Sequence, residues 1–470
     1  MALIEPVELL PPTQLGPVHF IAIGGAGMSG VAAMYAELGV PVSGSDQVDS
    51  PVLAALARLG VRTRVGHEAG QLGDAGTVVV SSAVRETNPE LAEARRRGLR
   101  VWHRSAALAA LMLDRTGIAV TGTHGKTTTS AMTAVLLAGA GADPSYVVGS
   151  PLTATGRAHH LGTGPAFVVE ADESDGSFRQ YPAQVVVITN VEADHLDNWG
   201  TAEAYAAGFV ALATAPAVTT VVLSADDPGA VALAPVIRAA GKTVLTFGEA
   251  AGADFRLTGL AQPPSGATAT LTGGGRSGEL RLAVPGRYNL HNAAAAVAVG
   301  AALGLPLEVL LAQAGRFTGT ERRFQPVAEV AGVRIFDDYA HHPTEVAATL
   351  TAARGLAGAG RVVACFQPHL FTRTRDFAAE FGNALALADE IVVLGIYPAR
   401  EDPIPGVSGR LVADAAGAVA PGRVRYAEDL QAAAPVLAGL VQPGDLVVTL
   451  GAGDVTRVGP QLAALLEARP

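Results

Sequence analysis

The segment that most constrains the fold is GIAVTGTHGKTTTS, residues 117–130. An apolar run comes first, then a glycine turn, a lysine–threonine pair and a run with helical spacing of apolar residues. A strand, a glycine-rich turn and a helix in this order form a phosphate-binding loop, because backbone N–H groups and the positive end of the helix face the anion. The segment therefore predicts an α/β domain that binds a nucleoside triphosphate.

The side chains of this loop suit a nucleotide with magnesium. Lys126 is predicted to reach the terminal phosphates and Thr127 to face Mg²⁺. The chain has only two lysines, Lys126 and Lys242, which strengthens the assignment of the first. The strict pattern has glycine where this chain has Val120, so a packing turn with a chance lysine is the alternative. The predicted ATP contacts are Gly122, Thr123, His124, Gly125, Lys126, Thr127 and Thr128.

The chain of 470 residues is long enough for several domains, and three blocks are visible in it. Residues 1–113 and 320–470 alternate β-rich with Ala/Leu-rich runs, which indicates parallel sheets covered by helices. Residues 114–319 begin with the phosphate loop and contain short alternating runs from 255 to 284, predicted to be antiparallel hairpins. The prediction is three α/β domains with these boundaries.

Charge and composition narrow the class of partner. A formal net charge of -10 argues against a general nucleic-acid or anionic-membrane surface. The single cysteine, Cys365, excludes an internal disulfide. The N-terminus does not resemble a signal peptide, and no unbroken apolar run is long enough to span a bilayer. We therefore expect a cytoplasmic protein that binds neither nucleic acid nor membrane.

A second glycine turn, Gly25, Gly27 and Gly30, follows the first predicted strand, and Asp46 ends the next strand about twenty residues later. This spacing fits a pyrophosphate at a helix N-terminus, but it does not separate NAD from a diphosphate such as a UDP-sugar. A packing turn without ligand is the other interpretation. The triphosphate loop favours an enzyme that spends ATP on a diphosphate-tagged substrate over an oxidoreductase or a nucleotide switch.

Acidic residues cluster after two predicted central strands. Carboxyl ends of parallel strands meet at one edge of a sheet, which also carries the phosphate loop. Oxygen ligands and one imidazole there suit Mg²⁺ bound largely through phosphates. His159 and His160 are predicted to lie in a polar surface loop. The clustered residues are Glu170, Asp172, Glu173 and Asp175 after one strand, and Asn190, Glu192, Asp194, His195 and Asp197 after the other.

The whole chain resembles the Mur ligase family. The motifs that carry the resemblance are GGAGMSG, GSD, VVSSAV, NPE, GTHGKTTT, EADESDGSF, TNVEADHLD, GRYNLHNAAAA, FTGTERRF, DDYAHHPTE, FQPHLFTRT, YPAREDPIPGVSG and LGAGD, in that order. The resemblance implies a Rossmann-like UDP-binding domain, a central ATPase-type domain with a mostly parallel sheet and an added antiparallel part, and a C-terminal Rossmann-like domain.

The activity that the resemblance implies is ATP-dependent ligation of L-alanine to the lactyl carboxylate of UDP-N-acetylmuramate, by a monomer or weak homodimer. A sister ligase that attaches a preformed peptide to the same sugar is the alternative. The implied UDP-sugar neighbours are Gly25, Gly27, Gly30, Ser45, Asp46, Ser82 and Arg104. The implied ATP and amino-acid residues are Asn289 and Asn292 near adenine, Arg322 or Arg323 near the γ-phosphate, and Asp338, His341 and Arg373 from the third domain. The implied magnesium ligands are Glu170 and His195, with Thr127.

Three positions depart from the family pattern. Leu370 stands where some members carry arginine, and Tyr288 stands where a histidine is usual. Several later-acting Mur ligases carry a carbamylated lysine beyond the DHLD motif, and this chain has no lysine there. Another group must therefore position a second magnesium ion.

Overall fold

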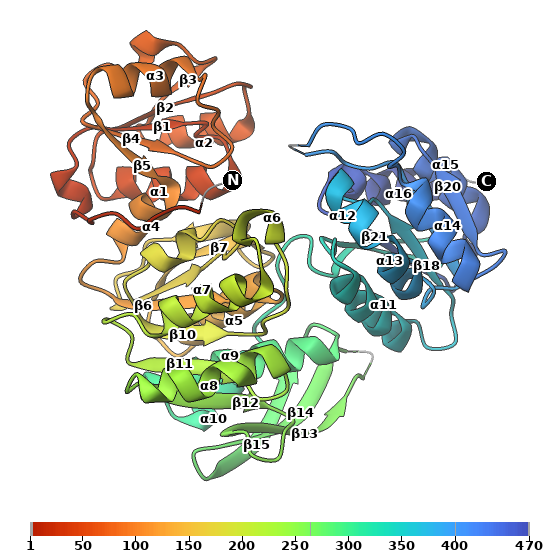
Figure 1. The fold of residues 1–470 in the computed structure, drawn as a ribbon. Coiled ribbons are helices and arrows are strands. Elements are labelled where there is room, and N and C mark those ends of the chain that lie inside the picture. The colour runs from red at the N-terminus through yellow and green to blue at the C-terminus, as the bar shows by residue number, and fades with distance from the viewer. Residues whose placement is uncertain (1–2, 264, 400, 469–470) are drawn as a thin grey trace. The chain divides into compact units, whose positions relative to one another are not determined.

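A computed structural model describes residues 3–263, 265–399 and 401–468. The chain forms two compact units. The first comprises residues 1–258, 270–280 and 291–317, and the second comprises residues 259–269, 281–290 and 318–470. Figure 1 shows the α/β organisation of the chain, which confirms the predicted fold class.

The N-terminal sheet is wholly parallel, with strand order β3-β2-β1-β4-β5. Because β1 pairs with β2 on one side and β4 on the other, the turn after β1 opens where the strand order reverses, the place where such sheets bind ligands. The strands are β1 (Val18–Ile21), β2 (Val42–Asp46), β3 (Arg62–Val65), β4 (Thr77–Val80) and β5 (Arg100–His103). The helices are α1 (Ala26–Glu37), α2 (Pro51–Arg58), α3 (Pro89–Arg96) and α4 (Arg104–Leu111).

The central sheet has the order β15-β14-β13-β12-β11-β10-β6-β9-β7-β8. Strand β6 lies between β9 and β10 and is parallel to both, so the phosphate loop opens between the two acidic segments. The strands are β6 (Thr116–Thr121), β7 (Ser145–Leu152), β8 (Arg157–His160), β9 (Ala166–Glu170), β10 (Ala183–Ile188), β11 (Thr220–Ser224), β12 (Thr243–Gly248), β13 (Phe255–Ala261), β14 (Ala267–Gly273) and β15 (Arg276–Leu282). The helices are α5 (Lys126–Gly139), α6 (Leu196–Trp199), α7 (Ala202–Ala213), α8 (Pro228–Ala239), α9 (Arg287–Ala302) and α10 (Leu307–Ala314).

One expectation for this sheet was wrong. His159 and His160 do not lie in a surface loop but on β8, which pairs antiparallel with β7 at the sheet edge. A Cβ atom placed on Gly30 would lie 3.0 Å from Nδ1 of His159, so this ring packs directly on helix α1. Strand β8 is short and polar, and it packs on β7 and α1 without an alternating apolar pattern of its own.

The C-terminal sheet has the order β16-β17-β21-β18-β19-β20 and is parallel except at the β16 edge. Apolar residues of β18 and β21 are fully buried, as expected for strands covered on both faces. The strands are β16 (Gln325–Val330), β17 (Val333–Asp338), β18 (Val362–Phe366), β19 (Glu390–Leu394), β20 (Val424–Ala427) and β21 (Leu446–Leu450). The helices are α11 (Pro343–Ala357), α12 (Phe371–Asp376), α13 (Ala378–Leu385), α14 (Arg410–Val419), α15 (Leu430–Leu440) and α16 (Val458–Glu467).

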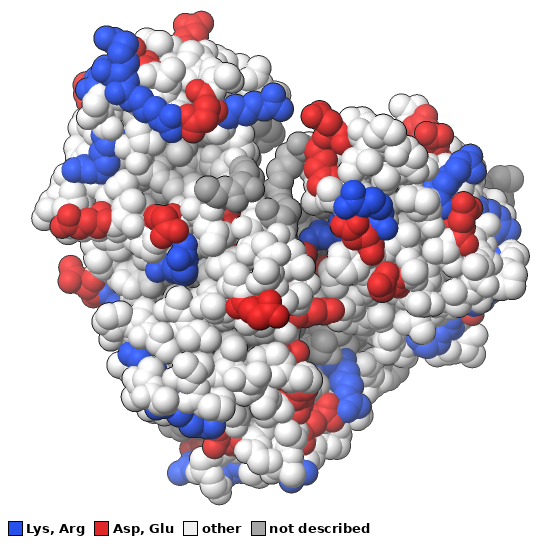
Figure 2. All heavy atoms as spheres, viewed as in Figure 1, with Lys and Arg blue, Asp and Glu red and all other residues white. Residues whose placement is uncertain are grey.

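Acidic and basic side chains are interspersed on the face drawn in Figure 2, in line with a modest net charge of -10. A phosphate ligand must therefore be bound by local donors rather than by a broad positive field. Among the described residues, no helix is both long and apolar enough to cross a membrane.

Candidate active site

The phosphate loop joins β6 to α5 and depends on two glycines. Gly122 and Gly125 have φ values of 125° and 81°, which disfavour any residue with a Cβ atom. A Cβ atom on Gly122 would also lie 2.1 Å from Oγ1 of Thr189, at the end of β10. The loop is further held from β10, since Asn190 Oδ1 accepts the backbone N–H of His124 at 2.8 Å. The sequence singled out this turn, and the structure forms it as a tight strand-to-helix connection.

Lys126 points back over its own loop. Its ammonium donates to the carbonyl oxygens of Gly122 at 2.8 Å and Thr123 at 3.0 Å, and it forms an ion pair with Glu173 at 2.8 Å. Burial lowers the pKa of Lys126, but the carboxylates of Glu173 and Asp172 outweigh burial and hold that pKa above its ordinary value. Lys126 is therefore a charged ammonium in a confined site.

Glu173 is fully buried beside this ammonium. Oε1 accepts from the Tyr205 hydroxyl at 3.1 Å, and the backbone carbonyl of Glu173 accepts from the Trp199 indole at 3.0 Å. Burial raises the pKa of Glu173 to about 7, Lys126 opposes that rise, and Asp172 adds to it. Glu173 is thus a carboxyl group that titrates near neutral pH within the phosphate loop's immediate surroundings.

Thr127 and Glu170 lie side by side and offer oxygen atoms of the kind that Mg²⁺ binds. The Thr127 hydroxyl donates to Oε1 of Glu170 at 3.0 Å, and Oε2 of Glu170 accepts from the backbone N–H of Gly149 at 2.7 Å. Neighbouring ligands of an octahedral Mg²⁺ ion lie about 2.9 Å apart, given metal–oxygen distances of about 2.1 Å. The separation of the two oxygens is thus compatible with neighbouring positions on such an ion.

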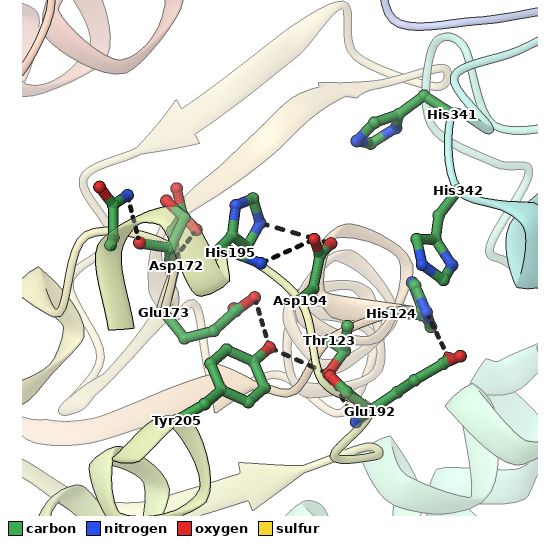
Figure 3. A network of polar contacts seen from close by, with 12 residues as sticks. Thr123, His124, Asp172, Glu173, Glu192, Asp194, His195, Tyr205, His341 and His342 are labelled. Carbon is green, nitrogen blue, oxygen red and sulfur yellow. Dashed lines mark hydrogen bonds and ion pairs between the residues drawn. The ribbon is translucent and has the colours of Figure 1, made fainter. Parts of the chain in front are cut away.

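The other predicted ligand, His195, has a different immediate partner. Its Nε2 lies 3.6 Å from Asp194 Oδ2, and its backbone N–H donates to Asp194 Oδ1 at 2.7 Å, as Figure 3 shows. His195 has a φ of 52°, an uncommon conformation for histidine at the N-terminus of a helix. The structure thus brings Thr127 and Glu170 together directly and places His195 against Asp194.

Arg104 connects the N-terminal glycine turn with the acidic segment after β9. A Cβ atom on Gly27 would lie 2.6 Å from Nη1 of Arg104, so the guanidinium lies on this glycine. Its Nη2 is 3.9 Å from Asp172 Oδ2. Ser82 makes a parallel connection, since its hydroxyl donates to Asp175 at 2.9 Å and lies 3.1 Å from Nε2 of His103. Within the first unit, Gly27, Ser82 and Arg104 thus lie next to the acidic segment that follows β9, which also contacts the phosphate loop through Glu173.

Two other residues predicted near the UDP-sugar have internal partners. Asp46 Oδ2 accepts the backbone N–H of Gly24 at 2.8 Å, which braces the glycine turn. Ser45 is fully buried, and its hydroxyl donates to Glu90 at 2.5 Å. Its role near the UDP-sugar stays a prediction.

In the second unit, Arg322 is committed to a backbone turn. Its guanidinium donates to the carbonyls of Gly451 at 2.7 Å and Gly453 at 3.1 Å, and it pairs with Asp337 at 3.3 Å. Arg323 lies over the ring of Tyr339, with 5.1 Å between the guanidinium carbon and the ring centroid. Arg322 lies over the same ring, with 5.0 Å between its guanidinium carbon and the ring centroid.

Asp338 and His341 lie just after β17. Both carboxylate oxygens of Asp338 accept backbone N–H groups, from Phe324 at 2.7 Å and Ala340 at 2.8 Å, and burial raises its pKa to about 6. Nδ1 of His341 lies 3.0 Å from the carbonyl oxygen of Tyr339, so this nitrogen carries a proton and donates. Nε2 then carries the lone pair in the neutral ring, which is the tautomer a base requires.

The remaining predicted residues also have defined surroundings. Arg373 lies on helix α12 and is only 7% exposed. The helix begins directly after Leu370, whose φ of 68° is unusual for leucine. Asn289 donates to the Pro285 carbonyl at 2.6 Å. Asn292, predicted near adenine, accepts from Thr129 at 3.1 Å and lies against Gly125, so the structure places it at the phosphate loop.

Sequence reasoning did not identify Tyr205 and Trp199, which hold Glu173. Trp199 on α6 and Tyr205 on α7 both belong to the apolar core. In the sequence, nothing distinguishes them from ordinary aromatic core residues. A polar handle on a buried aromatic residue needs a partner, and that requirement was the only available signal. It does not identify the partner.

Three comparisons place this architecture among known proteins. The descriptions "Mur ligase family, catalytic domain", "Mur ligase middle domain" and "Mur ligase, glutamate ligase domain" match residues 17–116, 120–300 and 322–453. A UDP-N-acetylmuramate–L-alanine ligase of Cutibacterium acnes is 64% identical and covers 100% of both chains. One from Kineococcus radiotolerans is 58% identical over 97% of each. A crystal structure of a UDP-N-acetylmuramate–alanine ligase from Thermotoga maritima has 29% identity, a TM-score of 0.79, and coverage of 96% of this chain and 98% of that one.

Proposed function

The chain belongs to the Mur ligase family, and on that premise we propose that it ligates L-alanine to the lactyl carboxylate of UDP-N-acetylmuramate at the expense of ATP. The products are UDP-N-acetylmuramoyl-L-alanine, ADP and phosphate, as needed for peptidoglycan precursor synthesis. The observation that carries this proposal is 64% identity over the full length to a relative with that name. Further relatives at 50% identity bear the same name, which favours alanine over a preformed peptide as the incoming group.

The reaction needs an activated carboxyl group, because a carboxylate is a poor electrophile. A lactyl carboxylate oxygen attacks the γ-phosphorus of ATP, the bond to ADP breaks, and an acyl phosphate forms. The amine of alanine then attacks the acyl carbon, and the tetrahedral intermediate collapses with loss of phosphate. Positioning and charge neutralisation supply most of the catalysis, and water must be kept from the acyl phosphate.

We assign the three sequence blocks to the three substrates. Residues 1–113 take the UDP-sugar through Gly25, Gly27 and Gly30 with Arg104, and Asp46 braces the turn. Residues 114–319 take ATP, with Lys126 on its phosphates. Thr127 and Glu170 would hold Mg²⁺, which when bound neutralises charge on the phosphate oxygens. Residues 320–470 supply the amino-acid groups Arg373 and His341, and Arg322 or Arg323 is assigned to the γ-phosphate.

The test is ADP release measured with UDP-N-acetylmuramate and each candidate acceptor in turn. We expect release with L-alanine and little with a preformed tripeptide that begins with L-alanine. Faster release with the tripeptide than with the free amino acid would replace this function by that of the sister ligase. If no acceptor gives ADP release and a nicotinamide cofactor binds, the first glycine turn would instead belong to an oxidoreductase.

The amino-acid site gives a first prediction. Arg373→Ala is expected to raise the KM for L-alanine about tenfold or more, since losing a hydrogen-bonded charge pair costs about 1.5–3 kcal/mol. The KM for the UDP-sugar should stay unchanged. The matched control is Arg375→Ala on the same helix, because Arg375 is exposed and pairs with its neighbour Asp376. If the KM for L-alanine is unchanged in Arg373→Ala, another residue binds the carboxylate of alanine.

His341 gives a second prediction. If its Nε2 accepts the proton of the attacking amine, His341→Ala should lower kcat about hundredfold with little change in either KM. Added imidazole should restore part of the lost rate, because it replaces the missing base. If imidazole does not restore any of the lost rate, His341 is not the base. Its role would then be structural, through its contacts with Tyr339 and with Glu345, 3.2 Å away.

A further inference from the structure

The ammonium of Lys126 already has three oxygen atoms close to it. It carries three N–H donors, and three acceptors lie within reach: the carbonyls of Gly122 and Thr123 and the carboxylate of Glu173. A phosphate oxygen that binds Lys126 therefore competes with these three oxygens for the ammonium. The two carbonyls belong to the loop that cradles the phosphate, whereas Glu173 is the only anion of the three. Glu173 thus occupies the place of a phosphate on this lysine.

Helices α6 and α7 hold Glu173 in that place. The Tyr205 hydroxyl contacts Oε1, the Trp199 indole holds the backbone carbonyl, and both rings belong to one edge-to-face aromatic cluster. Figure 3 shows the carboxyl group, Tyr205 and Thr123 in one line of contacts. A fully buried carboxyl group that loses its cation is strained as an anion and stable as a neutral acid.

The contacts beside Glu173 have a place for the proton that it would take up. The Thr123 hydroxyl donates to the Glu192 carbonyl at 2.9 Å, so its one hydrogen is used, yet its oxygen also lies 3.0 Å from the Tyr205 oxygen. If Glu173 is ionised, Tyr205 must donate to it, and the Tyr205–Thr123 contact lacks a hydrogen. If Glu173 is protonated, Glu173 donates to Tyr205, Tyr205 to Thr123, and Thr123 to the carbonyl. Every contact in the chain then has its hydrogen.

The electrostatics change in the same direction when a phosphate arrives. The charged and titratable groups that face Glu173 are Lys126 from α5, Asp172 from its own segment, and Tyr205 from α7. Burial and Asp172 raise the pKa of Glu173 to about 7, and Lys126 is the group that opposes this. A triphosphate that takes the charge of Lys126 removes the opposition and adds negative charge, so the pKa rises further.

We propose that Glu173 is a placeholder for the nucleotide phosphate on Lys126, that Tyr205 positions it there, and that Glu173 takes up one proton from solvent when the phosphate displaces it. The proposal rests on the proposed function in one respect, namely that ATP binds at this loop. Glu173 and Tyr205 act through Lys126 and are positioning residues. Binding of ATP is then coupled to proton uptake and weakens as the pH rises.

The test is calorimetry of ATP binding with Mg²⁺, without UDP-sugar or alanine, at pH 8 in buffers of different ionisation enthalpy. The wild type should take up close to one proton more per nucleotide than Glu173→Gln. This difference isolates Glu173, because the protons of ATP itself titrate equally with both proteins. Between pH 7 and pH 9 the wild-type Kd should rise about tenfold or more, and that of Glu173→Gln should stay nearly flat.

A second pair of variants protects the test against misfolding. Tyr205→Phe keeps the ring and removes the hydroxyl, and it should lower proton uptake and raise the Kd for ATP. Tyr35→Phe is the matched control, since its buried hydroxyl donates to the Ala107 carbonyl away from the loop, and it should behave as wild type. ATP binding with equal proton uptake in the wild type, Glu173→Gln and Tyr205→Phe would overturn the proposal and leave the ligase function intact. Absence of ATP binding in the wild type would instead contradict the proposed function.

Discussion

Lys126→Ala is expected to abolish ligation while UDP-sugar binding survives. Losing a main counter-charge of the transferring phosphate in a closed site removes about 3–4 kcal/mol of transition-state stabilisation, which slows the reaction several hundredfold. The UDP-sugar should still bind, because the first glycine turn lies on another sheet. The measurement is kcat from ADP release together with the Kd for the UDP-sugar.

Lys242 provides the matched control for this variant. It is the only other lysine, and its ammonium caps the carbonyls of Ala215 and Val218 rather than any part of the phosphate loop. Lys242→Ala should therefore retain near-normal turnover. Turnover of Lys126→Ala above about a tenth of the wild type would remove Lys126 from the mechanism, since that loss is only about 1.4 kcal/mol.

The single substitution also leaves the buried Glu173 carboxylate without its cation. Removing one partner of a buried ion pair costs about 3–5 kcal/mol of stability. Unfolding of the variant would therefore also lower its activity. The double variant Lys126→Ala/Glu173→Gln removes both charges and should regain much of the melting temperature but none of the turnover. Recovery of turnover in the double variant would show that the lysine acts only through stability.

The second large effect is expected at the magnesium ligands. Glu170→Ala should lower turnover about hundredfold and raise the magnesium concentration for half-maximal rate, because a missing carboxylate ligand weakens the ion that neutralises phosphate charge. His195→Ala should shift the magnesium dependence less, since His195 pairs with Asp194, whereas Glu170 contacts Thr127. The measurement is initial rate against magnesium at saturating ATP.

Glu170→Gln separates ligation from structure. The amide keeps an oxygen that accepts from the backbone N–H of Gly149, so the fold around β9 should persist. It loses the negative charge, so the magnesium requirement should still rise. If the magnesium dependence is the same in all three variants and the wild type, then Glu170 and His195 are packing or capping groups, and the ion depends on phosphates and other acids.

The predicted fold and family follow from local chemistry and are confirmed. Glycine turns that require positive φ, at Gly122 and Gly125, can be identified in a sequence because few other residues adopt that backbone. Polar residues at the carboxyl ends of parallel strands must share one edge, so Glu170 on β9 and Asn190 after β10 were expected beside β6. The roles of the individual site residues stay predictions, to be decided by the experiments above.

Only the tertiary structure decided which partner each polar side chain takes. Tyr205 and Thr123 are 82 positions apart, Thr129 and Asn292 are 163 apart, and Arg322 finds its carbonyls 129 to 131 positions away. Packing likewise decides that the Ser45 hydroxyl donates to Glu90 and that His159 lies on a strand at the sheet edge. Periodicity and turn chemistry are local and are written in neighbouring residues. A hydrogen-bond partner is chosen by the packing of distant elements, which brings a donor and an acceptor within about 3 Å without any local signal.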